Sequence, residues 1–173
     1  FFIANHQSWA DTPALFVALP VPLLFLGKAE LARVPFLGWY MSAMGMVFID
    51  RSDRVKAVRS VDRITRRLRE GWSLLSFPEG TRSPDGRVQS FRSATFAAAI
   101  DTGVPVVPVA LEGAGRILPR DGFKVRPGKV RVILGEPIAT AGLTRDDRAE
   151  LARRAQLEVQ AMLDGLAARN PQS

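Results

Sequence analysis

The chain has 173 residues, which fits one domain, and 47% of them are apolar, enough for a sizeable core. With no cysteine it has no disulfide, thiolate nucleophile or cysteine metal site, and this fits a reducing cytoplasm. The formal net charge of +7 indicates an anionic partner (nucleic acid, an acidic membrane surface, or a phosphorylated or CoA-bearing ligand), or simply a well-solvated basic surface.

Short apolar runs alternate with helical patterns along the chain. Six runs are typical of buried strands: residues 1–4, 23–26, 47–49, 72–77, 106–111 and 130–134. Strands that alternate with helices predict an α/β domain with a mixed, largely parallel sheet flanked by helices. Because no repeat, low-complexity tract or linker precedes the short tail, we expect a single domain over residues 1–173.

Two amphipathic helices are predicted. The first spans residues 53–70, with a cap at Asp53 or at the residue before it. Its outer face carries Lys56, Arg59, Arg63, Arg66, Arg67 and Arg69. The second spans residues 145–168, with Thr144 as its cap and Asp147 at the third helical position.

Two uncharged windows, residues 12–27 and 34–49, are shorter than the roughly 20 apolar residues that a membrane span needs. Three prolines also interrupt the first window. We expect both windows to be buried elements that do not cross a bilayer. The alternative for the second window is an interfacial patch formed by Trp39, Tyr40, Met41 and Met44.

The stretch NHQSWAD follows the first apolar run and contains the only histidine of the chain. If Asp11 lies in the first turn of the next helix, which Pro13 favours, it can accept a hydrogen bond from one imidazole nitrogen of His6. The other nitrogen is then free to take a proton. The spacing alone leaves two alternatives open, a general base with an orienting carboxylate or a helix cap beside an exposed histidine.

A second polar stretch, FPEGTRS, follows the run at residues 72–77. Pro78 ends the strand, and Gly80 allows a backbone turn whose N–H groups converge on an anion. Arg82 adds a planar fork suited to phosphate oxygens, while Glu79 either braces an arginine or accepts from a substrate hydroxyl. The alternative is a tight turn with a local Glu–Arg pair.

Two more cations follow predicted strands. Arg51 comes directly after residues 47–49, and Lys28 lies just past residues 23–26. Because ligands gather at the carboxyl ends of strands in α/β sheets, we expect both side chains to converge with His6. Taken singly, each is also explained as ordinary surface charge. No metal site is expected, since one histidine and no cysteine leave only carboxylates without a compact cluster.

Four blocks in this order resemble the glycerolipid acyltransferase family, which includes the 1-acylglycerol-3-phosphate acyltransferases. NHQSWAD matches the His-x4-Asp signature of that family, and GMVFIDR, FPEGTRS and VPVVPVAL follow at similar spacing. The resemblance covers residues 5–111 and thins out after Gly115. Where many relatives have Phe-Lys-x-Gly, this chain has FRSA at residues 91–94, so the glycine of that turn is lost.

The resemblance implies the fold of that family and a set of site residues. His6 would be the general base, and Asp11 would orient it. Pro108 in the fourth block would shape the region of the acyl donor. The glycerol phosphate of the acceptor would be held by Lys28, Arg51, Glu79, Gly80, Thr81 and Arg82.

The implied reaction moves a fatty acyl group from an acyl thioester to the free hydroxyl of a lysophospholipid. The expected acceptor is 1-acylglycerol-3-phosphate and the product phosphatidic acid, with acyl-CoA or acyl carrier protein as donor and no bound cofactor. Direct transfer needs no acyl-enzyme, and Ser8 lacks a nucleophile elbow, so we expect it to make local turn hydrogen bonds. The alternatives are another lysolipid acceptor such as lyso-ornithine lipid, a hydrolase, or a non-catalytic binder of phospholipid or acyl-CoA.

The resemblance also implies a location at the cytoplasmic face of the cell membrane. Because the chain begins inside an apolar run without methionine, we expect a fragment that lacks the N-terminal membrane-binding segment of the family. An anionic membrane surface is then the expected partner of the basic helix at residues 53–70 and of residues 39–44. Nucleic acid is not expected, because the basic residues lack interleaved exposed aromatics.

Overall fold

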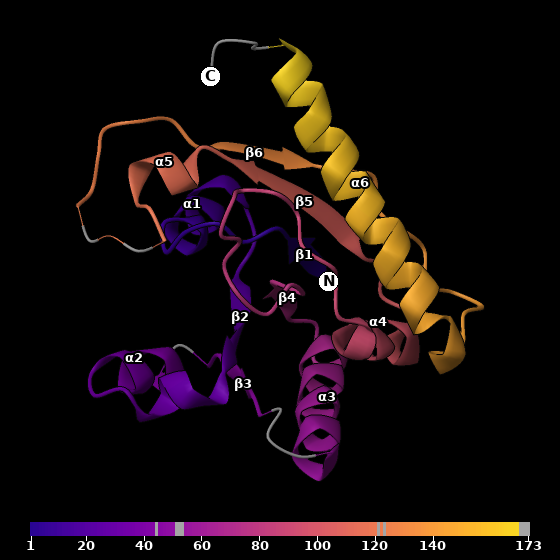
Figure 1. The fold of residues 1–173 in the computed structure, drawn as a ribbon. Helices are drawn as coiled ribbons and strands as arrows, with labels where there is room; N and C mark the ends of the chain where they lie inside the picture. The colour runs from indigo at the N-terminus through magenta and orange to yellow at the C-terminus, as the bar shows by residue number, and fades with distance from the viewer. Residues whose placement is uncertain (44, 51–53, 121, 123, 170–173) are drawn as a thin grey trace.

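The computed structural model describes residues 1–43, 45–50, 54–120, 122 and 124–169. Within this part of the chain, six strands form one sheet in the order β3-β2-β4-β1-β5-β6 (Figure 1). The strands are β1 Phe2–Ala4, β2 Leu23–Lys28, β3 Val47–Ile49, β4 Ser73–Ser76, β5 Val107–Glu112 and β6 Arg131–Leu134. Neighbouring strands are parallel except β6, which is antiparallel to β5. The predicted α/β class and mixed, largely parallel sheet are confirmed.

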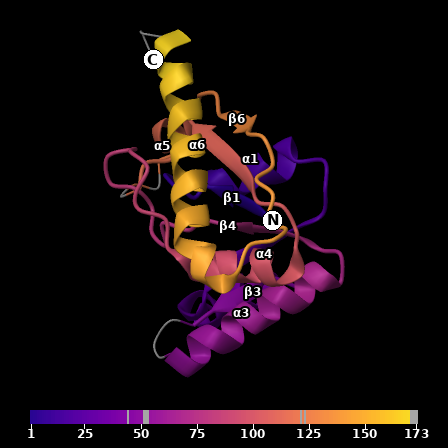
Figure 2. The ribbon, with the colours of Figure 1, turned by 90° about the vertical axis from the view of Figure 1, so that its right-hand side faces the viewer.

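Helices cover both faces of the sheet. They are α1 Asp11–Ala18, α2 Leu37–Ala43, α3 Arg54–Arg69, α4 Phe96–Thr102, α5 Ala114–Ile117 and α6 Arg148–Arg169. Three 3-10 turns accompany them, η1 Ala29–Arg33, η2 Ser93–Thr95 and η3 Arg145–Asp147. In Figures 1 and 2, α3, α4 and α6 lie on one side of the sheet and α1 on the other.

Two hydrophobic clusters fill the space between the sheet and these helices. Leu74 of β4 belongs to the cluster that packs against α3, α4 and α6, and the next residue, Leu75, belongs to the cluster that packs against α1. Successive side chains of a strand point to opposite faces, so a strand covered on both faces is apolar throughout. This burial explains why the strands are continuous apolar runs in the sequence.

Both predicted amphipathic helices are present. Ile64 and Leu68 on the apolar side of α3 are buried in the larger cluster. At the start of the second helix, Thr144 and Asp147 form the predicted capping box, and the backbone N–H of Thr144 donates to Oδ2 of Asp147 at 2.7 Å. The predicted cap at Asp53 or the preceding residue lies outside the described residues.

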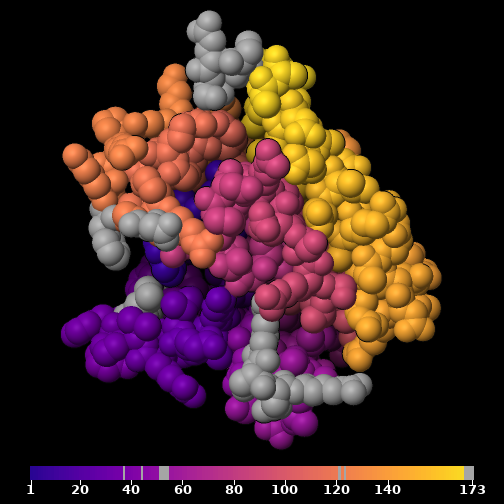
Figure 3. Space-filling model, in the orientation of Figure 1, coloured from indigo at the N-terminus to yellow at the C-terminus, as the bar shows by residue number. Residues whose placement is uncertain are grey.

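The expectation that the two uncharged windows are buried is wrong for part of each. In the second window, Phe36, Trp39 and Tyr40 are 79%, 67% and 58% exposed, and in the first window Val17 is 90% exposed. The η1–α2 region packs beside β3 at an edge of the sheet, at the corner of the molecule away from α6 (Figures 1 and 3), where no other described element covers these side chains. Of the predicted interfacial patch, Met41 is buried and Met44 lies outside the described residues. None of the described helices has the length and apolar character needed to span a bilayer.

Candidate active site

The loop that carries His6 begins where β1 ends beside β5. Asn5 is buried, and its side chain exchanges two hydrogen bonds with the backbone of Leu111: Nδ2 donates to the carbonyl at 2.9 Å, and Oδ1 accepts from the N–H at 2.8 Å. A side chain thus continues the pairing of β1 with β5 for one more residue. Because both bonds are buried, Asn5 fixes the point at which the His6 loop leaves the sheet.

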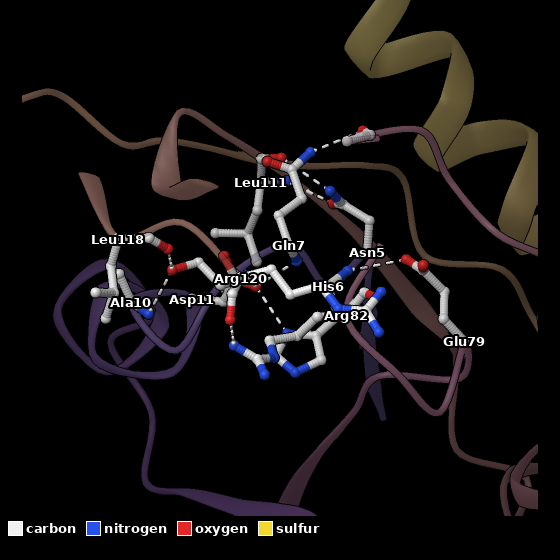
Figure 4. A network of polar contacts seen from close by, with 12 residues as sticks. Asn5, His6, Gln7, Ala10, Asp11, Glu79, Arg82, Leu111, Leu118 and Arg120 are labelled. Atoms are coloured by element: carbon white, nitrogen blue, oxygen red, sulfur yellow. Dashed lines mark hydrogen bonds and ion pairs between the residues drawn. The ribbon is translucent and has the colours of Figure 1, made fainter. Parts of the chain in front are cut away.

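His6 and Asp11 are in direct contact, as predicted (Figure 4). Nδ1 of His6 lies 2.7 Å from Oδ2 of Asp11, and the same oxygen accepts the backbone N–H groups of Gln7 at 2.7 Å and Ser8 at 2.8 Å. Asp11 is fully buried as the first residue of α1, so three donors hold its carboxylate in one position. Since Oδ2 can only accept, the imidazole proton is placed on Nδ1, and Nε2 is the nitrogen able to take a proton.

The plane of the imidazole is fixed by Phe77. The two rings are stacked, with centroids 4.1 Å apart and an interplanar angle of 16°. Phe77 follows β4, and it adjoins the end of β1 because Ile3 is paired with Ser76. The His6 side chain is 16% exposed, so a small part of a ring held by Asp11 and Phe77 remains accessible.

Glu79 contacts the His6 loop. Its Oε1 accepts the backbone N–H of His6 at 2.9 Å, and the N–H of Ser83 donates to the carbonyl of His6 at 2.7 Å. The FPEGTRS turn is therefore bonded to both backbone groups of His6. Burial raises the pKa of Glu79 to about 7, although the hydrogen bond from His6 opposes this shift. The alternative in which Glu79 braces Arg82 is not what the structure shows.

Gly80 permits the predicted turn. Its φ of 73° lies in the left-handed region that favours glycine, and its N–H donates to the carbonyl of Phe77 at 3.0 Å. The N–H groups of Gly80 and Ser83 are therefore occupied by the protein itself. In the part of the chain that the structure describes, the N–H groups of Thr81 and Arg82 have no acceptor. These two donors, beside a guanidinium, are the ones available to an anion.

Arg82 is held from two sides. Its Nη1 donates to the carbonyl of Arg120 at 2.8 Å, and Nη1 of Arg120 donates back to the carbonyl of Arg82 at 2.8 Å. The guanidinium carbon lies 4.8 Å from the ring centroid of Trp9, in the range of a cation–π contact. The positions of Trp9 and Arg120 therefore set where Arg82 can meet a ligand.

The structure brings most, but not all, of the predicted site residues together. Lys28 ends β2 and is exposed, and β4 separates β2 from β1. Thr81 is exposed on the FPEGTRS turn. Arg51 lies outside the described residues. Ser8 makes the predicted local bond, since its Oγ accepts from the N–H of Ala10 at 3.0 Å, but the same hydroxyl also makes a long-range bond to the carbonyl of Leu118 at 2.7 Å.

Comparison with known proteins identifies the family. A protein-family model described as Acyltransferase matches residues 1–112, which contain the four sequence blocks. The chain belongs to the acyltransferase family. The predicted resemblance to glycerolipid acyltransferases is thereby confirmed, since relatives at 32% to 41% identity are named 1-acyl-sn-glycerol-3-phosphate acyltransferase.

Three relatives illustrate the similarity of this acyltransferase to known proteins. The chloroplastic 1-acyl-sn-glycerol-3-phosphate acyltransferase LPAT1 of Arabidopsis thaliana is 41% identical over 79% of this chain, which spans only 38% of that relative. The lyso-ornithine lipid O-acyltransferase of Pseudomonas aeruginosa is 37% identical over 96% of this chain and 69% of its own length. The crystal structure of the 1-acyl-sn-glycerophosphate acyltransferase PlsC from Thermotoga maritima superposes with a TM-score of 0.81, at 34% identity, over 96% of this chain and 66% of that one.

Sequence reasoning missed three residues that shape the site of this acyltransferase: Phe77, Trp9 and Arg120. Phe77 is the first residue of the FPEGTRS block, so strand register is the signal that would have found it. Trp9 lies between His6 and Asp11 in the sequence, but its cation–π partner Arg82 is far from it along the chain, so no local pattern indicates that contact. Arg120 is 38 residues from its partner Arg82, and nothing local in the sequence indicates that contact.

Proposed function

We propose that this acyltransferase moves a fatty acyl group from an acyl thioester to the free hydroxyl of a lysophospholipid, with 1-acylglycerol-3-phosphate as acceptor and phosphatidic acid as product. The observation that carries the proposal is the 2.7 Å contact between Nδ1 of His6 and Oδ2 of the buried Asp11. It leaves Nε2 of an accessible imidazole beside a turn with unoccupied donors. The names of the relatives support the choice of reaction and acceptor.

In the proposed mechanism, His6 is the general base. Its Nε2 takes the proton of the acceptor hydroxyl while that oxygen attacks the thioester carbonyl. Collapse of the tetrahedral intermediate breaks the C–S bond, and the imidazolium returns the proton to the leaving thiolate. Asp11 orients the ring and stabilises the imidazolium during this cycle, as a carboxylate does in the serine hydrolase triads. No residue of the chain becomes acylated.

The FPEGTRS turn binds the phosphate of the acceptor in this proposal. Arg82 offers two parallel donors, and the N–H groups of Thr81 and Arg82 add backbone donors that need no further reorganisation. Glu79 and Gly80 shape the turn and bond it to His6, so the phosphate site and the base keep a fixed separation. Lys28 adds positive charge at the carboxyl end of β2, and Arg51, which the sequence places two residues after β3, is proposed as a further phosphate contact.

A membrane surface is the proposed place of action, at the cytoplasmic face. Phe36 and Trp39 are exposed, with ring centroids 5.5 Å apart, and Phe36 has a φ of 63°, an uncommon value for a residue with a side chain. Strain at an exposed apolar residue indicates a functional constraint. Aromatic rings of this kind suit the headgroup region of a bilayer, and the cations along α3 favour anionic lipids.

A second candidate acceptor is lyso-ornithine lipid, because the relative with that name aligns over 96% of this chain and 69% of its own length. A product assay with labelled acyl-CoA or acyl carrier protein, run with each lysolipid and without any, decides among the functions. Phosphatidic acid that forms only with lysophosphatidic acid supports the proposal. Free fatty acid alone would identify a hydrolase, and unchanged donor would identify a binding domain.

A further inference from the structure

A cleft of about 800 Å³ lies beside the His6 loop, and neither His6 nor Asp11 lines it. Three segments form its walls: the loop at residues 83–88, the described part of the segment between β5 and β6, and the last turns of α6. In Figure 3 these segments face the viewer, with the β5–β6 segment (orange) and α6 (yellow) on either side of the loop. The volume is in the range of sites that hold a cofactor or drug-sized ligand.

The walls of this cleft carry an excess of positive charge. Among the described residues that line it are six cationic side chains, Arg87, Arg116, Arg120, Lys124, Arg126 and Arg131, against the three carboxylates Asp85, Glu112 and Asp164. The single carboxylate of Glu112 forms ion pairs with both Arg116 and Arg131. Lys124 and Arg126 have no side-chain hydrogen bond or ion pair with any described residue. Uncompensated cations in a concave surface attract a ligand with several negative charges.

The cleft is coupled to the active site through short contacts. Gln7, the residue after His6, lines the cleft and donates from Nε2 to the carbonyl of Gly86 at 3.0 Å. Ser83 also lines it, and its N–H donates to the carbonyl of His6 at 2.7 Å. An extended ligand anchored by its charged end in the cleft can therefore reach His6 with its other end.

The cleft and the proposed acceptor site are neighbours that meet at the end of the FPEGTRS turn, since Ser83 lines the cleft and Arg120 of its wall exchanges two hydrogen bonds with Arg82. Lys28 follows β2 on one side of β1, whereas the other walls of the cleft are built next to β5 and β6 on the other side. His6 follows β1 and thus lies between the two regions. Two substrates can therefore meet near the imidazole while using different cations, the acceptor phosphate Arg82 and the donor Lys124 and Arg126.

We propose that this cleft binds the phosphorylated nucleotide end of acyl-CoA and so presents the thioester to His6. The inference rests on the proposed function, because it takes the acyl thioester as the donor. Coenzyme A carries a diphosphate and a 3′-phosphate on one adenosine, which matches a concave site with several cations. Acyl carrier protein brings a single phosphodiester on its arm and binds through a protein surface, which a cleft of this shape suits less well.

The test is binding of free coenzyme A to the full chain in solution, without lipid, measured by calorimetry. The double variant Lys124→Ala/Arg126→Ala should bind coenzyme A roughly ten- to a hundredfold more weakly than the parent, since charge-assisted contacts to phosphate are among the stronger hydrogen bonds. The matched control is Lys129→Ala/Arg154→Ala, which removes the same two residue types from exposed positions that do not line the cleft. This control should bind coenzyme A as the parent does.

A second ligand locates the contact. Dephospho-coenzyme A, which lacks the 3′-phosphate, should bind the parent more weakly than coenzyme A, and this difference should shrink in Lys124→Ala/Arg126→Ala. Equal affinity of the parent and this double variant for coenzyme A would overturn the proposal, as would a loss of acyl carrier protein binding alone. His6→Ala should retain coenzyme A binding, so a failure of the proposed reaction is distinguishable from a failure of the cleft assignment.

Discussion

At the scale of single residues, one oxygen atom organises the candidate site. Oδ2 of Asp11 accepts from the imidazole of His6 and from two backbone N–H groups of the same loop. The backbone bonds hold the carboxylate, and the carboxylate selects which imidazole nitrogen carries the proton. Phe77 then sets the plane of the ring. The proposed base is thus positioned before any substrate binds, which is what general base catalysis requires.

Asp11→Asn tests this arrangement. An amide at this position keeps an oxygen for the backbone donors of Gln7 and Ser8, but it no longer favours the tautomer with its proton on Nδ1 or stabilises the imidazolium. We expect kcat for acyl transfer to fall by roughly 10²- to 10⁴-fold with a small change in Tm. Steady-state kinetics and thermal unfolding measure the two effects, and a rate within threefold of the parent would refute the orienting role.

The raised pKa of Glu79 should make the free energy of unfolding depend on pH. Burial raises its pKa from 4.5 to about 7, so the folded protein holds a proton that the unfolded chain releases at lower pH. The stabilisation is fully present below pH 4.5 and is lost as the pH rises through 7. A shift of this size corresponds to up to about 3 kcal/mol in the free energy of unfolding.

Glu79→Gln removes this titration but keeps an oxygen that can accept from the N–H of His6. Urea unfolding at pH 5 and pH 8 should show a larger loss of stability for the parent than for Glu79→Gln. The difference in the free energy of unfolding between the two proteins should change by about 2 kcal/mol from one pH to the other. Parallel curves for both proteins would show that Glu79 titrates normally in the folded state.

Arg82 is predicted to recognise the phosphate of the acceptor. Charge-assisted hydrogen bonds contribute roughly 1.5–3 kcal/mol each, and 1.4 kcal/mol is a factor of ten. Arg82→Ala should therefore raise KM for lysophosphatidic acid by roughly ten- to a hundredfold, and Arg82→Lys should also impair it because the planar fork is lost. Monoacylglycerol, which has no phosphate, is the control acceptor. An equal loss with both acceptors would make Arg82 a structural residue of the turn.

At the scale of elements, the amphipathic helix α3 can be predicted from the sequence, whereas the largely buried helix α4 cannot. Ile64 and Leu68 of α3 face the core while its cations face solvent, so the helical period is visible in the sequence. The first five residues of α4 are all buried, so this helix has too little polar surface to produce a period. The sequence therefore does not predict α4. The short α2 was missed because its aromatic residues face outward at an edge of the sheet.

The exposed aromatics of α2 are predicted to bind membranes. Burying a large aromatic side chain stabilises by about 1.5–3 kcal/mol, so Trp39→Ala should weaken binding to anionic vesicles roughly tenfold. Trp72→Ala is the matched control, because Trp72 is also exposed but precedes β4, at the opposite end of that strand from the FPEGTRS turn. Co-sedimentation with vesicles at two salt concentrations provides the measurement. Equal loss in both variants would argue against a specific membrane face.

At the scale of the whole molecule, the sheet places sequence blocks that are far apart around one point. The class of fold and all six strands could be predicted, because burial on both faces makes each strand a recognisable apolar run. The His6–Asp11 pair could be predicted because its partners are five residues apart. The contacts of His6 with Phe77 and Glu79 depend on strand order and register, which a single sequence does not determine.

The central claim is that His6 acts as the base in acyl transfer to a lysophospholipid. The most direct measurement is the rate of phosphatidic acid formation from labelled acyl-CoA and lysophosphatidic acid by the parent, His6→Ala and His6→Gln, each shown to be folded by circular dichroism. Glutamine keeps a donor for Asp11 but cannot take a proton, so both variants should be slower by roughly 10²- to 10⁴-fold. A rate near that of the parent in either folded variant would contradict the account.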